Sequence, residues 1–113
     1  PPPPPPIIFD EIDPGIGGEI ADTVGRLLHT LGQSRQVLCI THLPQVAAYA
    51  DAHYRIEKHS DGKETQTRVT ALDDEARITE IARMLGSADS DTSREHARSM
   101  LARKASVNIA RHA

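Results

Sequence analysis

Residues 7–18 read IIFDEIDPGIGG, and this stretch decides the fold class. Its first three residues are apolar and predict a buried strand, which ends in two adjacent carboxylates, Asp10 and Glu11. Glycine and proline fill most of the remainder and predict a loop. A strand that delivers acidic groups into a loop is typical of the ligand-binding edge of an α/β sheet.

The residues after this loop complete a βαβ unit. Apolar side chains at helical spacing predict a helix from about Glu19 to Leu31, and Gly32 is placed to end it. The side chains on that face are Ile20, Val24, Leu27, Leu28 and Leu31. A second apolar run, 36–41, predicts another buried strand. Two strands joined by one helix over so short a distance are expected to be parallel, with a right-handed crossover.

The second half of the chain predicts a hairpin and helices. The expected elements are a short helix 44–50, strands 54–58 and 65–72, a helix 74–85 and a last helix 92–104. Asp61-Gly62 lies between the two strands and is a hairpin signal. Asp73 is placed to cap the next helix and Gly86 to end it, and residues 92–95 (TSRE) have the form of a capping box. The inward-facing candidates on the last two helices are Ile78, Ile81, Ala82, Leu85, Ala97, Met100 and Leu101. The apolar residues of 105–113 show no clear helical or strand periodicity, which predicts a frayed tail.

The composition limits the size and class of the protein but does not indicate its function. Its 113 residues allow one small domain, and a net charge of −3 does not indicate nucleic-acid binding. The single cysteine, Cys39, excludes a disulfide within the chain and predicts a buried, reduced thiol. No apolar stretch approaches the roughly 18 residues that span a bilayer, so a soluble intracellular setting fits best. The segment 1–6 is polyproline, which we interpret as an artefact or a disordered segment rather than a ligand for an SH3-type domain.

The paired carboxylates are the first candidate for chemistry. Adjacent strand residues point in opposite directions, so Asp10 and Glu11 are expected to do different jobs. One can hold Mg²⁺ while the other faces a nucleophilic water. An acidic loop that merely caps the next helix is the alternative, and these residues alone leave both interpretations open.

The second candidate is His42, in the sequence Thr41-His42-Leu43-Pro44-Gln45 after the second predicted strand. Parallel strands end at the same edge, so His42 is expected near the two carboxylates. There an imidazole can contact a phosphate oxygen or a positioned water, although an ordinary surface role is the alternative. The remaining histidines are interpreted as surface residues: His29, His53, His59, His96 and His112. None has the spacing of a zinc ligand set.

Three blocks of sequence together resemble the RecN family of SMC-like, ABC-type ATPases. They are 8–18 (IFDEIDPGIGG), 37–47 (VLCITHLPQVA) and 76–86 (ARITEIARMLG), in the order and spacing of that family. The resemblance covers about residues 7–101. It implies an α/β, partial P-loop NTPase fold in which residues 7–104 are the C-terminal part of an ATPase head.

The resemblance also assigns roles to individual residues. It implies that Asp10 holds Mg²⁺ as the Walker B aspartate and that Glu11 is the base that activates water. His42 resembles the switch histidine that senses the γ-phosphate. The resemblance places Asp13, Gly17, Gly18 and Gln45 among the nucleotide-binding residues, the first three of them in the D-loop. ATP and Mg²⁺ are therefore the expected cofactors of the intact head.

The resemblance implies a bacterial, cytoplasmic and nucleoid-associated protein of DNA double-strand break repair and recombination. Its expected partners are an N-terminal head segment with Walker A, a second head in an ATP-dependent dimer, and double-stranded DNA or DNA ends. Pro14 departs from the small or β-branched residue usual in the family, which puts the D-loop contacts in doubt.

The chain contains no G-x-x-x-x-G-K-[ST] phosphate loop and no Ser-Gly-Gly signature segment. We therefore expect these 113 residues alone to lack ATPase activity. The alternatives are another SMC-like or ABC-type ATPase subunit, or a non-catalytic α/β binding module. Transporter ATPases are disfavoured because no proline follows Glu11.

Overall fold

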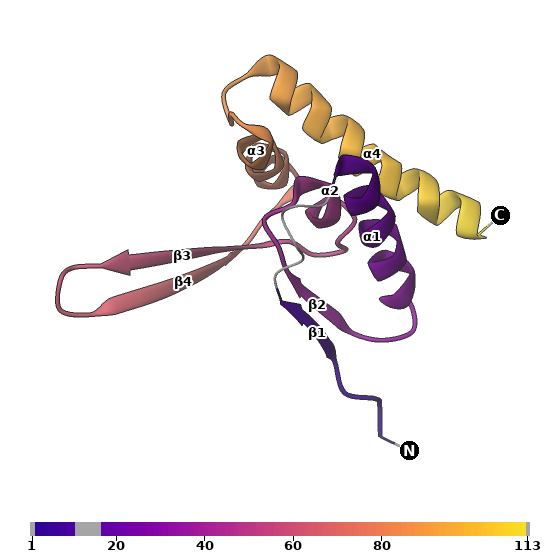
Figure 1. The fold of residues 1–113 in the computed structure, drawn as a ribbon, viewed down its shortest axis with the longest axis horizontal. Helices are drawn as coiled ribbons and strands as arrows, with labels where there is room; N and C mark the ends of the chain where they lie inside the picture. The colour runs from indigo at the N-terminus through magenta and orange to yellow at the C-terminus, as the bar shows by residue number, and fades with distance from the viewer. Residues whose placement is uncertain (1, 11–16, 113) are drawn as a thin grey trace.

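The computed structural model describes the backbone of residues 2–10 and 17–112 and the side chains of these residues as far as Lys104. It is a small α/β fold with one parallel strand pair, one antiparallel hairpin and helices (Figure 1). The elements in chain order are β1 (Ile7–Asp10), α1 (Gly18–Leu31), β2 (Val37–Ile40), α2 (Pro44–Ala47), β3 (Tyr54–Ser60), β4 (Thr65–Ala71), α3 (Asp74–Leu85) and α4 (Asp91–His112). Residues 11–16, which include Glu11 and Asp13, lie outside the described residues.

The strands β1 and β2 form the parallel pair that the sequence predicts. Their register runs from Ile7 opposite Val37 to Asp10 opposite Ile40. One face of the pair is half-buried and includes Cys39, so the predicted burial of this thiol is only partial, and this partial burial raises its pKa. The opposite face is exposed and apolar. It carries Ile8, Leu38 and Ile40, whose exposed fractions are 63%, 47% and 49%.

Helix α1 does not bury its apolar stripe against the described residues. Its buried positions are Ala21, Gly25 and His29, whereas Ile20 and Leu27 are 57% and 64% exposed. The small residues face inward because α1 packs closely on α2, and a large side chain would hold the two helices apart. Ile20 and Leu27 of the apolar stripe therefore face away from the rest of the described structure, whereas Val24, Leu28 and Leu31 are partly buried.

Two of the predicted surface histidines are not at the surface. His29 is 6% exposed, and its Nδ1 lies 3.7 Å from the carboxylate of Asp51. His53 is half-buried, and its pKa is lowered by burial and by the nearby Arg77. Both predictions failed because the two histidines lie near residues that are distant in sequence, Asp51 for His29 and Arg77 for His53, and no local pattern reveals such contacts.

The hydrophobic core lies among α2, α3 and α4. Its buried members are Ala47, Ala48, Ile81, Ala82, Ala97 and Met100. Ile78, Leu85 and Leu101 pack against this core and are partly buried, so the predicted inward faces of the last two helices are confirmed. The core is small and aliphatic because alanine makes up most of it.

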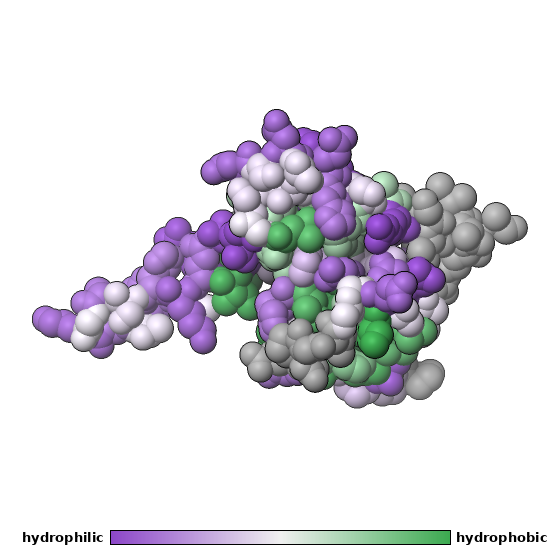
Figure 2. Space-filling model, turned by 45° about the horizontal axis from the view of Figure 1, so that its top comes forward, coloured by the Kyte–Doolittle hydropathy of each residue, from purple (hydrophilic) through white to green (hydrophobic). Residues whose placement is uncertain are grey.

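The hairpin β3–β4 projects away from the core (Figure 1). Its register pairs Tyr54 with Ala71 and Ser60 with Thr65, which confirms the predicted antiparallel pairing. At the turn, Oδ1 of Asp61 accepts hydrogen bonds from two backbone amides, and Gly62 has a φ of 89°. Figure 2 shows hydrophilic residues along much of this arm and hydrophobic residues gathered on the body of the molecule.

The predicted boundaries of α3 are confirmed, but those of α4 are not. Asp73 Oδ1 accepts a hydrogen bond from the amide of Ala76 (2.8 Å), and α3 ends before Gly86. At α4, Ser90 Oγ accepts from the amide of Ser93 (3.3 Å), so the cap lies before the predicted TSRE box. The predicted frayed tail is wrong, because the helix continues to His112.

The start of the chain joins β1 without forming a helix or strand of its own. Residues 2–6 are exposed, and Nη2 of Arg35 donates a hydrogen bond to the carbonyl of Pro5 (2.8 Å). Within the described ranges, no helix is long and apolar enough to cross a membrane.

Candidate functional site

The parallel pair brings the two predicted chemical groups to one edge of the sheet. Asp10 is the last residue of β1 and lies opposite Ile40, the last residue of β2. His42 follows two positions later, and both Asp10 and His42 are exposed. The turn between β2 and α2 is held by Thr41, whose Oγ1 accepts a hydrogen bond from the amide of Leu43 (3.0 Å). A carboxylate and an imidazole are therefore both presented at the carboxyl edge of this sheet.

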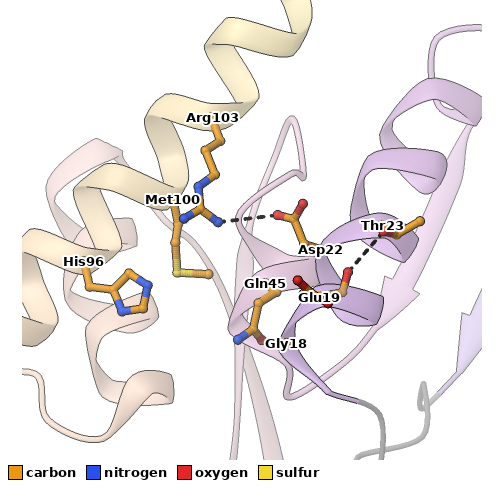
Figure 3. A pocket seen from close by; sticks show the side chains of 8 residues that line it. All are labelled: Gly18, Glu19, Asp22, Thr23, Gln45, His96, Met100 and Arg103. Carbon is orange, nitrogen blue, oxygen red and sulfur yellow. Dashed lines mark hydrogen bonds and ion pairs between the residues drawn. The ribbon is translucent and has the colours of Figure 1, made fainter.

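The start of α1 meets α2 beside this edge. Gly17 is the N-cap residue of α1, and a Cβ placed on Gly18 would lie 3.6 Å from Nε2 of Gln45. Gly18 and Gln45 also line an open cleft of about 500 Å³ between α1, α2 and α4 (Figure 3). The other residues that line it are Glu19, Asp22, Thr23, His96, Met100 and Arg103. The structure therefore brings two of the predicted nucleotide-binding residues together, with Gly17 adjacent in sequence.

One wall of the cleft is organised around Asp22. Its Oδ1 accepts a hydrogen bond from the hydroxyl of Tyr49 (2.9 Å), and its Oδ2 from Arg26 (2.9 Å). Arg103 of α4 approaches Oδ1 to 3.6 Å, as Figure 3 shows. Burial and the hydrogen bond to Asp22 raise the pKa of Tyr49. These contacts tie α1 to both α2 and α4.

Helix α2 is short and is held in place by residues of other elements. On the α1 side, a Cβ at Gly25 would lie 2.6 Å from Cδ2 of Tyr49 and 2.9 Å from the carbonyl oxygen of Gln45. On the α3 side, Nη2 of Arg77 donates to the carbonyls of Ala47, Ala48 and Ala50. The position of α2, which contains Gln45, is therefore constrained by α1 on one side and by α3 on the other.

The hairpin base is fixed to α3 by a charged group centred on Glu80. The side chain of Glu80 is 8% exposed and accepts hydrogen bonds from Nε and Nη2 of Arg83. Arg55 of β3 lies 3.9 Å from the same carboxylate. Hydrogen bonds from Arg83 lower the pKa of Glu80, against the opposing effect of its burial. Glu80 is therefore held as a carboxylate.

Sequence reasoning missed the residues that hold this site together. For Gly25 a signal existed, because glycine inside a helix costs about 1 kcal/mol relative to alanine and marks a close approach. Arg77 and Glu80 lie on a helix with ordinary charge spacing, and no local pattern distinguishes them from solvated residues. The predicted residues Asp10, Gly17, Gly18, His42 and Gln45 are described, whereas Glu11 and Asp13 lie outside the described residues.

Comparison with known proteins identifies the family, although no protein-family model matches the chain. The chain is 56% identical over 80 residues to the DNA repair protein RecN of Xylella fastidiosa, an alignment that covers 71% of the chain. It is 48% identical over 95 residues to RecN of Streptomyces coelicolor and 49% identical over 96 residues to RecN of Treponema pallidum. Those alignments cover 83% and 84% of the chain. The chain belongs to the RecN family.

The matched part is a minor share of each RecN protein. It amounts to 14% of the Xylella protein and 17% of the Streptomyces and Treponema proteins. The chain is therefore similar to one segment of RecN, and most of each relative has no counterpart in it.

Proposed function

We propose that this chain is the segment of a RecN-type ATPase head that supplies Walker B, the D-loop and the switch histidine in DNA double-strand break repair and recombination. The observation that carries the proposal is the parallel register of β1 and β2, which ends both strands at one edge with Asp10 and His42. Ligands of α/β sheets bind at that edge. Membership of the RecN family and the printed name of its members support the role in DNA repair.

Each residue of the proposed site has a defined task. Glu11 withdraws a proton from the attacking water, and His42 donates a hydrogen bond to the γ-phosphate. Asp13, Gly17 and Gly18 form the D-loop, which contacts the second head of an ATP-dependent dimer. Gln45, adjacent to Gly18, contacts the nucleotide or the loop that follows Glu11.

Asp10 suits the proposed Mg²⁺. Its carboxylate is exposed at the end of β1, and among the described residues none forms an ion pair with it. Mg²⁺ usually takes one or two carboxylates and completes its shell with phosphates and water, so a single exposed carboxylate is a sufficient protein ligand. When bound, Mg²⁺ would neutralise charge on the phosphates of ATP.

The exposed apolar faces support a further segment of the same head as partner. Parallel sheets are normally covered on both faces, yet Ile8, Leu38 and Ile40 are exposed on a pair of only two strands. Ile20 and Leu27 of α1 are exposed as well. We propose that the N-terminal head segment, which carries Walker A, covers these residues and supplies the phosphate loop that this chain lacks.

Reconstitution tests the proposal. The chain alone is expected to show no ATP hydrolysis, because the backbone amides and the lysine that hold phosphates come from the other segment. Addition of a RecN segment that carries the phosphate loop is expected to produce hydrolysis, with stimulation by double-stranded DNA ends. Glu11→Gln should abolish this activity, whereas Glu64→Gln, an exposed change beside the hairpin turn, should leave it intact.

Two results would overturn the proposal. One is hydrolysis by the highly purified chain alone that Glu11→Gln removes. The other is a reconstituted head whose activity survives Glu11→Gln, which would indicate that the acidic loop is structural and that the chain is a non-catalytic binding module.

A further inference from the structure

Arg77 makes an unusual set of contacts for an arginine that is partly buried. Its Nη2 donates hydrogen bonds to the carbonyls of Ala47 (3.1 Å), Ala48 (3.4 Å) and Ala50. These three oxygens belong to the last turn of α2 and the residues just after it, where helix carbonyls lack the usual amide partner one turn ahead; the Ala47 oxygen also accepts from the amide of Ala50 (3.2 Å). One guanidinium nitrogen on α3 thus satisfies acceptors on a segment 27 to 30 residues away in sequence.

The contacts also compensate the charge of Arg77. Within the described part of the chain Arg77 forms no ion pair, and its Nε is buried without a hydrogen-bond partner. Burial lowers its pKa, while the more distant carboxylates of Asp51 and Asp74 oppose that effect. The partial negative charges of the three α2 carbonyls that accept from Arg77 also favour its charged form. Arg77 is therefore a structural contact to the end of α2 and differs from an arginine whose charge faces solvent.

Helix α2 needs such an external support. With four residues it forms hardly more than one turn, and isolated helices shorter than about 12 residues are marginal in water. The amides of Val46 and Ala47 donate to the carbonyl of Leu43, so the helix and the turn that contains His42 form one hydrogen-bonded unit. Moving the end of α2 therefore moves its start, where His42 and Gln45 lie.

The opposite side of α2 leaves no room for it to shift. The backbone of Gly25 lies so close that an added Cβ would reach the carbonyl oxygen of Gln45 at 2.9 Å and Cα of Val46 at 3.1 Å. Helix α2 is thus confined between α1 on one side and Arg77 on the other.

We infer that Arg77 is a positioning residue that fixes His42 and Gln45 at the sheet edge by holding the carbonyl end of α2 from α3. This inference rests on the proposed function for the role of His42 and Gln45 toward nucleotide, although the mechanical link does not. Since α3 packs on α4 through Ile81, Ala82, Ala97 and Met100, the link joins the helical C-terminal half of the chain to the edge that carries the proposed chemistry.

The link is tested in the chain itself by amide hydrogen exchange and by NMR of the His42 and Gln45 side chains. In Arg77→Gln, the amides of Val46 and Ala47 should exchange about ten to a hundred times faster, as expected for loss of a charge-assisted hydrogen bond. The His42 and Gln45 resonances should shift, while the β3–β4 amides stay protected. The exchange rates of Arg77→Lys, which retains a cationic donor group, should lie between those of the wild type and those of Arg77→Gln. Arg98→Gln on α4 is the matched control, because Arg98 is an exposed arginine.

The outcomes separate this inference from the proposed function. A folded Arg77→Gln chain with unchanged exchange and unchanged His42 and Gln45 resonances would overturn it. If Arg77→Gln does not fold, Arg77→Lys decides by the same readouts. In an intact RecN-family protein that carries this segment, Arg77→Lys should lower kcat for ATP hydrolysis and leave KM nearly unchanged. Absence of any Glu11-dependent hydrolysis would refute the proposed function and leave the exchange result standing.

Discussion

Substituting Gly25 by alanine tests how tightly α1 and α2 pack. An added Cβ would lie 2.6 Å from Cδ2 of Tyr49, 2.9 Å from the carbonyl oxygen of Gln45 and 3.1 Å from Cα of Val46. The tyrosine ring can rotate away, but two of the three atoms belong to the backbone of α2 and cannot move without moving the helix.

The expected cost follows from two opposing effects. Overpacking of a close contact costs about 1 to 3 kcal/mol, and contact with backbone atoms favours the upper half of that range. Replacing a mid-helix glycine by alanine recovers about 1 kcal/mol of helix propensity. We therefore expect Gly25→Ala to lower the free energy of unfolding by about 1 to 2 kcal/mol.

Urea unfolding followed by circular dichroism measures this difference. The chain has no tryptophan, so far-ultraviolet signal from its helices is the suitable probe. Gly32→Ala at the other end of α1 is the matched control, because Gly32 has a φ of −63° and a Cβ there meets its nearest atoms at 3.4 Å. The control should be neutral or slightly stabilising. A Gly25→Ala chain as stable as the wild type would refute the close packing of α1 on α2.

Three further substitutions have expected outcomes. Asp73→Ala removes the hydrogen bond to the start of α3 and should cost about 1 kcal/mol in thermal unfolding, whereas the exposed neighbour Asp74→Ala should cost less. The pKa of Glu80 is lowered in the fold from 4.5, chiefly by Arg83, so its carboxylate stabilises the fold above pH 4.5 and this contribution is lost as the pH falls further. Glu80→Gln should therefore lower stability at neutral pH and flatten its fall below pH 4.5, and a pH series of unfolding curves that matches the wild type would contradict this linkage. Leu38→Lys on the exposed sheet face should change the stability of the chain by less than about 0.5 kcal/mol yet prevent reconstitution with the phosphate-loop segment in a pull-down; retained binding would refute that face as the docking surface.

The sequence predicts the elements well where their signals are local. Strand β1, the parallel pair, the hairpin and the start and end of α3 follow from apolar runs, from Asp61-Gly62, and from Asp73 and Gly86. The start of α4 was predicted incorrectly because Ser90 and Thr92 both resemble capping residues, and only the hydrogen bond from Ser93 distinguishes them.

The site is only partly predictable, for a different reason. Parallel pairing places Asp10 and His42 at one edge, because strand direction alone determines which ends meet. The supports of α2 depend on which helix faces meet in space. Arg77 donates to backbone carbonyls, which no sequence pattern marks. The apolar side chains of α1, such as Ile20 and Leu27, predict that their own face is buried, whereas the buried face of this helix is the one with the small residues.

The exposure of β2, on its apolar face and along one edge, affects how the chain behaves during synthesis. Residues 36–41 read QVLCIT, a six-residue segment with no charge, no proline and no glycine. Segments of this kind stack into cross-β fibrils when their backbone edges are open. Strand β2 pairs here with β1 alone, which leaves its other edge without a strand partner in the described residues. The open edge of β2 therefore makes the chain aggregation-prone, and under the proposed function its solubility should rise on co-expression with the phosphate-loop segment.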